Sequence, residues 1–240
     1  MRSRKTPIVL GIILVASGLA GCQGKTTTEE THDTRAGFVS LFNGSDLEGW
    51  KTSPDIRKHW SVKDGVIAFD GVREHLWTTQ DFTDFELLID WRWVGDSQGP
   101  RNRQVIEPDG SYRLDKDGNQ VTVEVEERDS GIFLRGNSKS QVNIWVWPVG
   151  SGEVWGYRTD ASMPPATRAA ATPKVPADNP VFAWNQFRIR LVGETLNVEL
   201  NGQHVIEDCQ LPGVPATGPI GLQAHGSAIE FRNVMIKPLP

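Results

Sequence analysis

Several common features are scarce or missing in this 240-residue sequence. Positive charge is not in excess, because 25 Lys and Arg face 30 Asp and Glu and no basic stripe is clustered, which excludes a nucleic-acid-binding protein. The only long apolar run lies between residues 8 and 20 and is too short to span a bilayer comfortably. The G-x-S-x-G elbow, the H-E-x-x-H zinc motif and the phosphate-binding loop are also absent, so the enzyme classes that depend on them are disfavoured.

The apolar run belongs to a predicted export signal. Basic residues precede it, and it ends in Leu-Ala-Gly-Cys at residues 19–22, which resembles the bacterial lipobox. We therefore predict a lipoprotein signal peptide over 1–22, with Cys22 acylated and the exported protein anchored by lipid to a bacterial membrane. The alternative is an ordinary secretory signal in which the cysteine is coincidental. Residues 23–37 are polar and Thr-rich, which predicts a flexible tether.

Cysteine is too rare for a disulfide framework. The sequence contains only Cys22 and Cys209, so lipidation of Cys22 leaves no partner for an intrachain disulfide. We expect Cys209 to be a small buried apolar side chain.

Short alternating segments dominate the chain from Phe38 onward. Its 24 glycines and 15 prolines leave no room for a long amphipathic helix. We predict a β-hairpin in which Asn201-Gly202 forms a type I′ turn between the two flanking strands. The expected strands are 85–94, 130–136, 141–147, 153–158, 185–193, 195–200, 203–208, 219–226 and 228–236. Many short antiparallel strands predict an all-β domain over 38–240, a β-sandwich of two sheets, with long surface loops at 95–120 and 159–180.

Two of these strands carry polar groups that suggest binding. In QVNIWVW (141–147), Val142, Ile144 and Val146 share one face, which we assign to the core. Amides and indoles on the opposite face match the mixed surface of a pyranose and predict a sugar-binding surface; they are Gln141, Asn143, Trp145 and Trp147. In FELLIDWRW (85–93), Glu86 and Asp90 lie opposite an apolar face. They bind substrate if their face is concave and are solvated charges if it is convex.

Several segments occur in the order found in a known family. They are FVSLFNGSDLEGW (38–50), HWSVKDGVI (59–67), LWTTQDFTDFELLIDWR (76–92), SGIFLRG (130–136), WNQFRIRL (184–191) and GPIGLQAHGSAIEFRNVMIK (218–237). Together they resemble the bacterial 3-keto-disaccharide hydrolase domain. This resemblance implies a concanavalin A-like jelly roll that cleaves glycosides oxidised at C3 of the sugar.

The chemistry that the resemblance implies requires three kinds of group. A C3 ketone acidifies the C2 proton, and the glycosidic oxygen on C1 is then a β leaving group; elimination followed by hydration amounts to hydrolysis. A base at C2, a positive charge or a divalent cation at the enolate oxygen, and an acid at the leaving oxygen are needed. A divalent cation is an option, and Glu86 and Asp90 could ligate it through oxygen if their strand face is concave.

Four residues are candidates for these roles. His225, in LQAHG, is the expected acid or base. Arg135, in SGIFLRG, is expected to stabilise the enolate or, alternatively, to pair with an acid of a neighbouring strand. Glu153 is a candidate acidic group and Tyr157 a candidate substrate contact. Many relatives carry Glu where this chain has Lys139, which weakens any transfer of a base role to that strand.

Three other kinds of function compete with this hypothesis. A classical glycosidase needs two carboxylates at a defined separation, and EVEERD (124–129) has the charge but not the spacing. A non-catalytic carbohydrate-binding module fits the nine tryptophans, and a structural surface domain is the weakest alternative.

Overall fold

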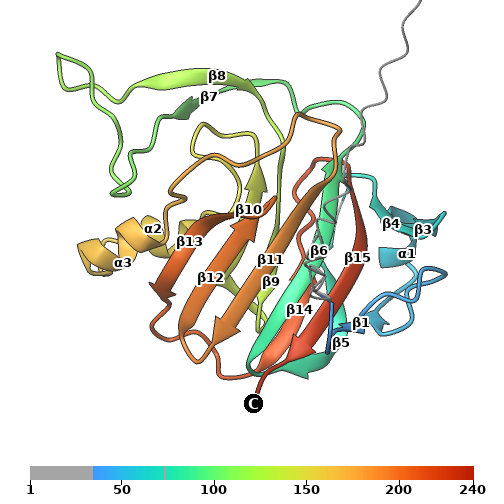
Figure 1. Ribbon diagram of the computed structural model, residues 1–240. Helices are drawn as coiled ribbons and strands as arrows, with labels where there is room; N and C mark the ends of the chain where they lie inside the picture. Colours follow the sequence, from blue (N-terminus) through green and yellow to red (C-terminus); the bar gives the residue numbers. More distant parts are fainter. Residues whose placement is uncertain (1–34, 73) are drawn as a thin grey trace, which may run out of the picture. The chain divides into compact units, whose positions relative to one another are not determined.

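Alternating apolar side chains build two antiparallel β-sheets that pack face to face (Figure 1). The computed structural model describes residues 35–72 and 74–240. The larger sheet runs in the order β13 (Gln203–Gln210), β12 (Thr195–Leu200), β11 (Asn185–Val192), β6 (Phe85–Trp93), β15 (Ile229–Pro238), β4 (Val66–Phe69), β3 (Trp60–Lys63), with β1 (Val39–Ser40) paired to β15. The smaller sheet runs in the order β10 (Asn137–Trp145), β9 (Asp129–Leu134), β14 (Gly218–Leu222), β5 (Leu76–Phe82), β2 (Trp50–Lys51). The predicted β-sandwich is confirmed.

The core lies between the two sheets. On β6, Phe85, Leu87, Ile89, Trp91 and Trp93 are each at most 3% exposed, as their spacing of two predicts. From the smaller sheet, β10 contributes Val142 and Ile144, which are also completely buried, together with residues of β9 and β14. The apolar face expected for each of these strands is therefore the core face.

The predicted hairpin at Asn201-Gly202 is confirmed. Leu200 of β12 pairs with Gln203 of β13, so the loop contains two residues only. Asn201 and Gly202 have φ angles of 52° and 78°, and positive φ at both central positions is what a type I′ turn requires.

One predicted strand is wrong. Residues 153–158 do not extend β10 but form the short helix α2 (Trp155–Arg158). Besides Glu153, the buried side chains here are Val154, Tyr157 and Arg158, which follow a spacing of three and four rather than two. Only Gly152 and Glu153 make backbone hydrogen bonds to Asn143 before the chain turns into α2. The alternation in this segment is too short to distinguish a strand from one helical turn.

The two predicted loops contain regular structure. Residues 95–126, which we call the excursion, include the two-stranded sheet of β7 (Pro100–Gln104) and β8 (Thr122–Glu126), visible above the sandwich in Figure 1. A small second core of Ile106, Trp145 and Val149 attaches the excursion to the end of β10. Residues 159–180 include α3 (Pro165–Ala170), and α1 (Ile56–His59) is the remaining short helix in the described chain.

The predicted signal peptide, Cys22 and most of the tether lie outside the described residues. Within residues 35–72 and 74–240, no helix is long and apolar enough to cross a membrane. Cys209 is buried and unpaired, in agreement with the prediction of a small core side chain.

Candidate functional site

A pocket of about 680 Å³ opens on the face of the smaller sheet that points away from the core. It lies over β10 and β9 and beside the ends of β14 and β5, between the excursion and α2. Its lining is aromatic, amide-bearing and ionisable: His75, Arg103, Asp129, Phe133, Ser138, Lys139, Gln141, Asn143, Trp145, Trp147, Trp155, Gly156, Gln223 and His225. The structure therefore brings His225 together with the four residues predicted from the alternation of β10.

The floor of the pocket depends on a glycine that lets aromatic rings cross the sheet. Gly221 of β14 pairs with Phe133 on one side and Trp77 on the other. A Cβ at Gly221 would lie 2.6 Å from the Trp77 ring, so only glycine lets Trp77 and Phe133 stack across it, with ring centroids 5.2 Å apart. Phe133, which lines the pocket, is thus a flat apolar ring supported by Trp77, of the kind that binds the face of a sugar ring.

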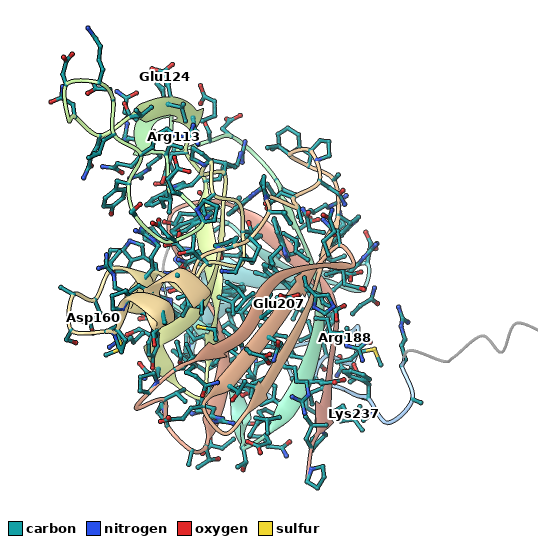
Figure 2. The ribbon with its side chains drawn as sticks, turned by 60° about the vertical axis from the view of Figure 1, so that its left-hand side comes forward. Arg113, Glu124, Asp160, Arg188, Glu207 and Lys237 are labelled. Atoms are coloured by element: carbon teal, nitrogen blue, oxygen red, sulfur yellow. The ribbon has the colours of Figure 1, made fainter. Side chains whose placement is uncertain are left out.

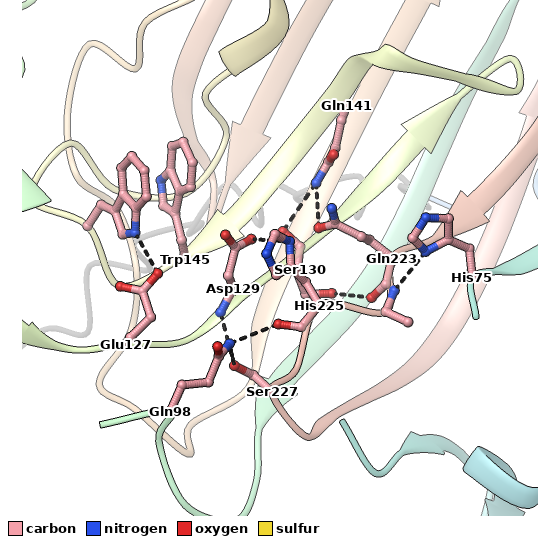
Figure 3. A network of polar contacts seen from close by, with 12 residues as sticks. His75, Gln98, Glu127, Asp129, Ser130, Gln141, Trp145, Gln223, His225 and Ser227 are labelled. Carbon is pink, nitrogen blue, oxygen red and sulfur yellow. Dashed lines mark hydrogen bonds and ion pairs between the residues drawn. The ribbon is translucent and has the colours of Figure 1, made fainter. Parts of the chain in front are cut away.

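His75 is fixed as a hydrogen-bond donor to the pocket. The backbone N–H of Ala224 donates to His75 Nδ1 at 3.1 Å, so Nδ1 carries no proton and Nε2 carries it (Figure 3). Burial lowers the pKa of His75, and the neighbouring His225 lowers it further. His75 is therefore a neutral imidazole whose Nε2–H can donate to an oxygen of a ligand.

His225 has the opposite arrangement. Its Nδ1 lies 3.6 Å from Asp129 Oδ1, so a proton on Nδ1 points toward this carboxyl and leaves Nε2 with a free lone pair (Figure 3). Burial lowers the pKa of His225. Burial, with Glu127 nearby, raises the pKa of Asp129 to about 7, against the opposing effect of Arg103. The pair therefore changes protonation near neutral pH.

Gln98 and Ser227 hold this pair in place. Gln98 Nε2 donates to the carbonyl oxygen of His225 and to Ser227 Oγ, both at 2.8 Å. Ser227 Oγ in turn accepts the backbone N–H of Asp129 at 3.1 Å. Both ends of the His225–Asp129 pair are thus tied to the same two side chains.

The excursion contributes a positive charge to the pocket wall. Arg103 of β7 forms an ion pair with the buried Glu127 and stacks over the ring of Trp147 at 4.4 Å. Trp147 stacks on Trp145 at 4.0 Å, and its indole N–H donates to Glu127. This wall combines a guanidinium with two indoles at the end of β10.

Amide groups line the middle of the pocket. Gln141 Nε2 donates to Gln223 Oε1 at 2.7 Å, which fixes both side chains. Asn143 is only 5% exposed, yet within the described chain its side-chain amide makes no hydrogen bond. Since buried polar groups are almost always paired, Asn143 presents an unused donor and acceptor to a ligand.

Arg135 lies outside the pocket. It occupies a positive φ of 50° and is 2% exposed. Its guanidinium donates to the carbonyls of Thr83, Gly193 and Pro215 and pairs with Asp84. These contacts use the guanidinium to tie loops together, and its ionic partner is Asp84 rather than the neighbouring-strand acids, Asp90 or Glu86, that the sequence suggested.

Glu153 and Tyr157 also lie outside the pocket lining. Glu153 is completely buried in an ion pair with Arg158. Tyr157 is completely buried under α2, and its hydroxyl donates to the Pro212 carbonyl at 3.3 Å. The helical turn of α2 points Tyr157 inward, whereas the neighbouring Trp155, on the other side of the helix, is 49% exposed and lines the pocket.

Glu86 and Asp90 project from the larger sheet, away from the core. Glu86 pairs with Arg188 and Arg190, and Asp90 accepts hydrogen bonds from Gln186 and Asn233. Figure 2 shows Arg188 on the larger sheet. Neither carboxylate lines the pocket, and neither is a solvated charge, because both are paired and Asp90 is only 6% exposed.

Sequence reasoning missed His75, Arg103, Asp129 and Trp155. Two of these positions had a usable signal, because His75 and Trp77 alternate with the buried Leu76 and Thr78, and Asp129 shares a strand face with Phe133. Arg103 lies in a segment read as a loop, and Trp155 in one read as a strand, so their positions depended on tertiary structure.

A metal centre is not evident in the part of the chain that the structure describes. No group of three or more His, Cys, Asp or Glu side chains in residues 35–72 and 74–240 is arranged to hold a metal ion. The positive charge among the described pocket residues comes from Arg103 and Lys139.

Comparisons with known proteins agree with this geometry. A 3-keto-disaccharide hydrolase of Bacteroides thetaiotaomicron is 22% identical over 245 residues, covering 85% of this chain and 79% of that protein. Solved structures of candidate glycosyl hydrolases from Parabacteroides distasonis share the fold. One has a TM-score of 0.58 at 23% identity over 85% of this chain and 84% of its own, and another has 0.56 at 22% identity over 84% and 99%.

The profile of one family covers most of the sequence. The 3-keto-alpha-glucoside-1,2-lyase-like domain matches residues 37–237, which include both sheets and every residue of the pocket. This protein therefore belongs to the family of 3-keto-alpha-glucoside-1,2-lyase-like domains.

Proposed function

We propose that this protein cleaves 3-keto-glycosides by elimination across C1 and C2 followed by hydration. The observation that carries the proposal is the pair of histidines with opposite proton arrangements in one pocket. His75 offers an Nε2–H because its Nδ1 accepts the Ala224 N–H, and the Asp129 carboxyl 3.6 Å from Nδ1 of His225 favours an Nε2 lone pair on that ring. A donor and a base facing one ligand is what an enolisation requires.

The first step assigns a role to each group. His225 Nε2 removes the C2 proton while its Nδ1–H is stabilised by Asp129, and the electrons move to the C3 oxygen. The Nε2–H of His75 donates to this oxygen as it becomes negative, and Arg103 supplies positive charge in the same pocket. A neutral imidazole is suited to this role because its N–H is a weak acid, which donates a hydrogen bond to the oxygen without transferring the proton.

The second step breaks the glycosidic bond. The enolate collapses, the C1–O bond breaks with the electrons leaving on the glycosidic oxygen, and this oxygen takes the proton held by His225. Addition of water across C1 and C2 then gives the 3-keto sugar. Gln141, Gln223 and Asn143 would bind the sugar hydroxyls, and the Phe133–Trp77 floor would support the ring.

Release of product from an oxidised disaccharide tests the proposal. We expect the purified protein to release 3-keto-glucose from 3-keto-trehalose, with and without added Mg²⁺ or Ca²⁺ in parallel, and His225→Gln to be slower by at least about a hundredfold. His59→Gln is the matched control, because His59 pairs with Asp70 outside the pocket lining. Binding without release in every condition would instead support a non-catalytic carbohydrate-binding domain.

We also propose that the chain is exported and held at a bacterial membrane by lipid on Cys22. The support is the sequence Leu-Ala-Gly-Cys at residues 19–22 after a basic, apolar segment. Incorporation of labelled palmitate that is lost in Cys22→Ser would support the anchor, and labelling of both proteins or of neither would contradict it.

A further inference from the structure

An exposed tryptophan stands at one end of the pocket. Trp155, the first residue of α2, is 49% exposed, although the other described tryptophans of the pocket, Trp145 and Trp147, are buried or partly buried. Those two indoles stack on each other, and Arg103 covers Trp147. Trp155 is therefore the indole of the pocket whose face is open to a ligand.

The pocket is long enough for two sugar rings. His75 adjoins β5, and Trp155 lies beyond β10 at the edge of the smaller sheet, with β14 and β9 in between. Three steps between neighbouring strands span about 14 Å. A single ring held by His75 and His225 would leave the region over β10 and α2 unfilled.

Two features hold α2 where Trp155 can reach the pocket. Gly156 packs on β10 so closely that an added Cβ would lie 2.6 Å from the Lys139 carbonyl oxygen. The buried ion pair of Glu153 with Arg158 ties the start of α2 to its end. Lys139, which also lines the pocket here, is paired with Asp160 at 2.6 Å.

We infer that Trp155, Gly156 and Lys139 form the subsite for the leaving group, and that Trp155 selects leaving groups with a flat apolar face, such as a second sugar ring. The inference rests on the proposed function, which places the reacting ring beside His75 and His225. The leaving group on C1 then extends along the pocket toward α2, because the opposite wall is filled by the Trp145–Trp147–Arg103 stack.

Two substrates with the same reacting ring test this subsite. Trp155→Ala is expected to lower kcat/KM for 3-keto-trehalose up to about tenfold, mainly through KM, the size expected for one lost stacking contact. Cleavage of methyl 3-keto-α-glucoside, whose leaving group is too small to reach α2, should stay within about twofold. Trp155→Phe should restore most of the loss. Trp184→Ala, which removes an indole stacked on Arg232 of the larger sheet, is the control.

The outcomes separate this inference from the proposed function. An equal change for both substrates, or no change for either, overturns the subsite. If the unaltered protein cleaves neither substrate, the proposed function fails, and calorimetric binding of the same two compounds still decides the subsite. A selective loss of 3-keto-trehalose affinity in Trp155→Ala supports it, and equal affinities in the variant and the unaltered protein overturn it.

Discussion

The two pocket histidines differ in which ring nitrogen carries the proton, because different groups face their Nδ1 atoms. A backbone N–H faces Nδ1 of His75, and a carboxyl faces Nδ1 of His225. A backbone N–H can only donate, so His75 carries its proton on Nε2, whereas the Asp129 carboxylate, when ionised, favours a proton on Nδ1 of His225. One type of side chain thereby provides both the proposed donor and the proposed base.

Asp129 leads to a pH prediction at this scale. Its raised pKa of about 7 means that the carboxyl is neutral below that pH and charged above it. Since the proposed base needs the carboxylate, we expect kcat/KM for 3-keto-trehalose to rise as pH increases through about 7, with the apparent pKa belonging to the pair. In Asp129→Asn, kcat/KM at pH 8 should fall about a hundredfold, and the limb should move to lower pH, where His225 alone titrates.

Asp109→Asn, which changes an exposed carboxyl of the excursion, is the control and should keep the profile of the unaltered protein. If the pH profile of kcat/KM in Asp129→Asn coincided with that of the unaltered protein, Asp129 would have no part in the titration.

At this scale the sequence identified part of the site. Gln141, Asn143 and His225 line the pocket as predicted, because strand alternation and a family motif are local signals. Arg135 belongs to an equally clear motif, but whether its guanidinium reaches a ligand or a neighbouring loop depends on chain segments far away in sequence, namely Thr83, Gly193 and Pro215.

Strand β10 separates stability from ligand binding between adjacent residues. Its even-numbered residues Val142 and Ile144 enter the core, and Gln141 and Asn143 face the pocket. Every residue of the strand from Ser140 to Trp145 is buried, on the pocket side as well as on the core side. The unusual composition of this strand thus reflects burial of one face in the core between the sheets and burial of the other face in the pocket.

Substitutions at adjacent positions of β10 should have opposite consequences. Ile144→Ala is expected to lower the free energy of unfolding by about 2–5 kcal/mol, because it leaves a cavity in the core. Asn143→Ala should change it by less than about 1 kcal/mol but lower kcat/KM about tenfold, since only a contact to ligand is lost. Urea denaturation and steady-state kinetics measure the two effects. Equal destabilisation by both substitutions would mean that Asn143 has a structural role instead.

The periodicity of β10 predicted its faces, and the same reasoning gave the wrong structure for residues 153–158. A long alternation constrains the structure, whereas four alternating residues fit a helical turn equally well. The edge position of β10 and its contact with Gly156 explain why the chain turns into α2 at this point.

On the scale of the whole domain, the excursion completes the pocket. It brings Arg103 to the end of β10 and is attached there by Ile106, Trp145 and Val149, a cluster separate from the main core. A segment held by a small cluster should open locally without unfolding of the two sheets.

Ile106→Ala should therefore loosen the excursion alone. We expect faster deuterium uptake in residues 100–126 and a lower kcat/KM, because Arg103 is less firmly placed, while the urea midpoint changes much less than in Ile144→Ala. Val123→Ala, which shortens a side chain of β8 that is 40% exposed, is the control and should leave deuterium uptake, kcat/KM and the urea midpoint unchanged. A midpoint lowered as much as in Ile144→Ala would show that the excursion and the sandwich unfold together.

The sequence by itself determined the β-sandwich, the core faces of its long strands, the Asn201-Gly202 hairpin and the pocket-facing side of β10, because each depends on the local alternation of side chains or on local turn chemistry. Only the tertiary structure decided which ionisable groups meet. His75, Arg103, Asp129 and His225 come from four separate segments, and the pKa values of the two histidines and Asp129 are shifted by burial and by partners that no local pattern contains.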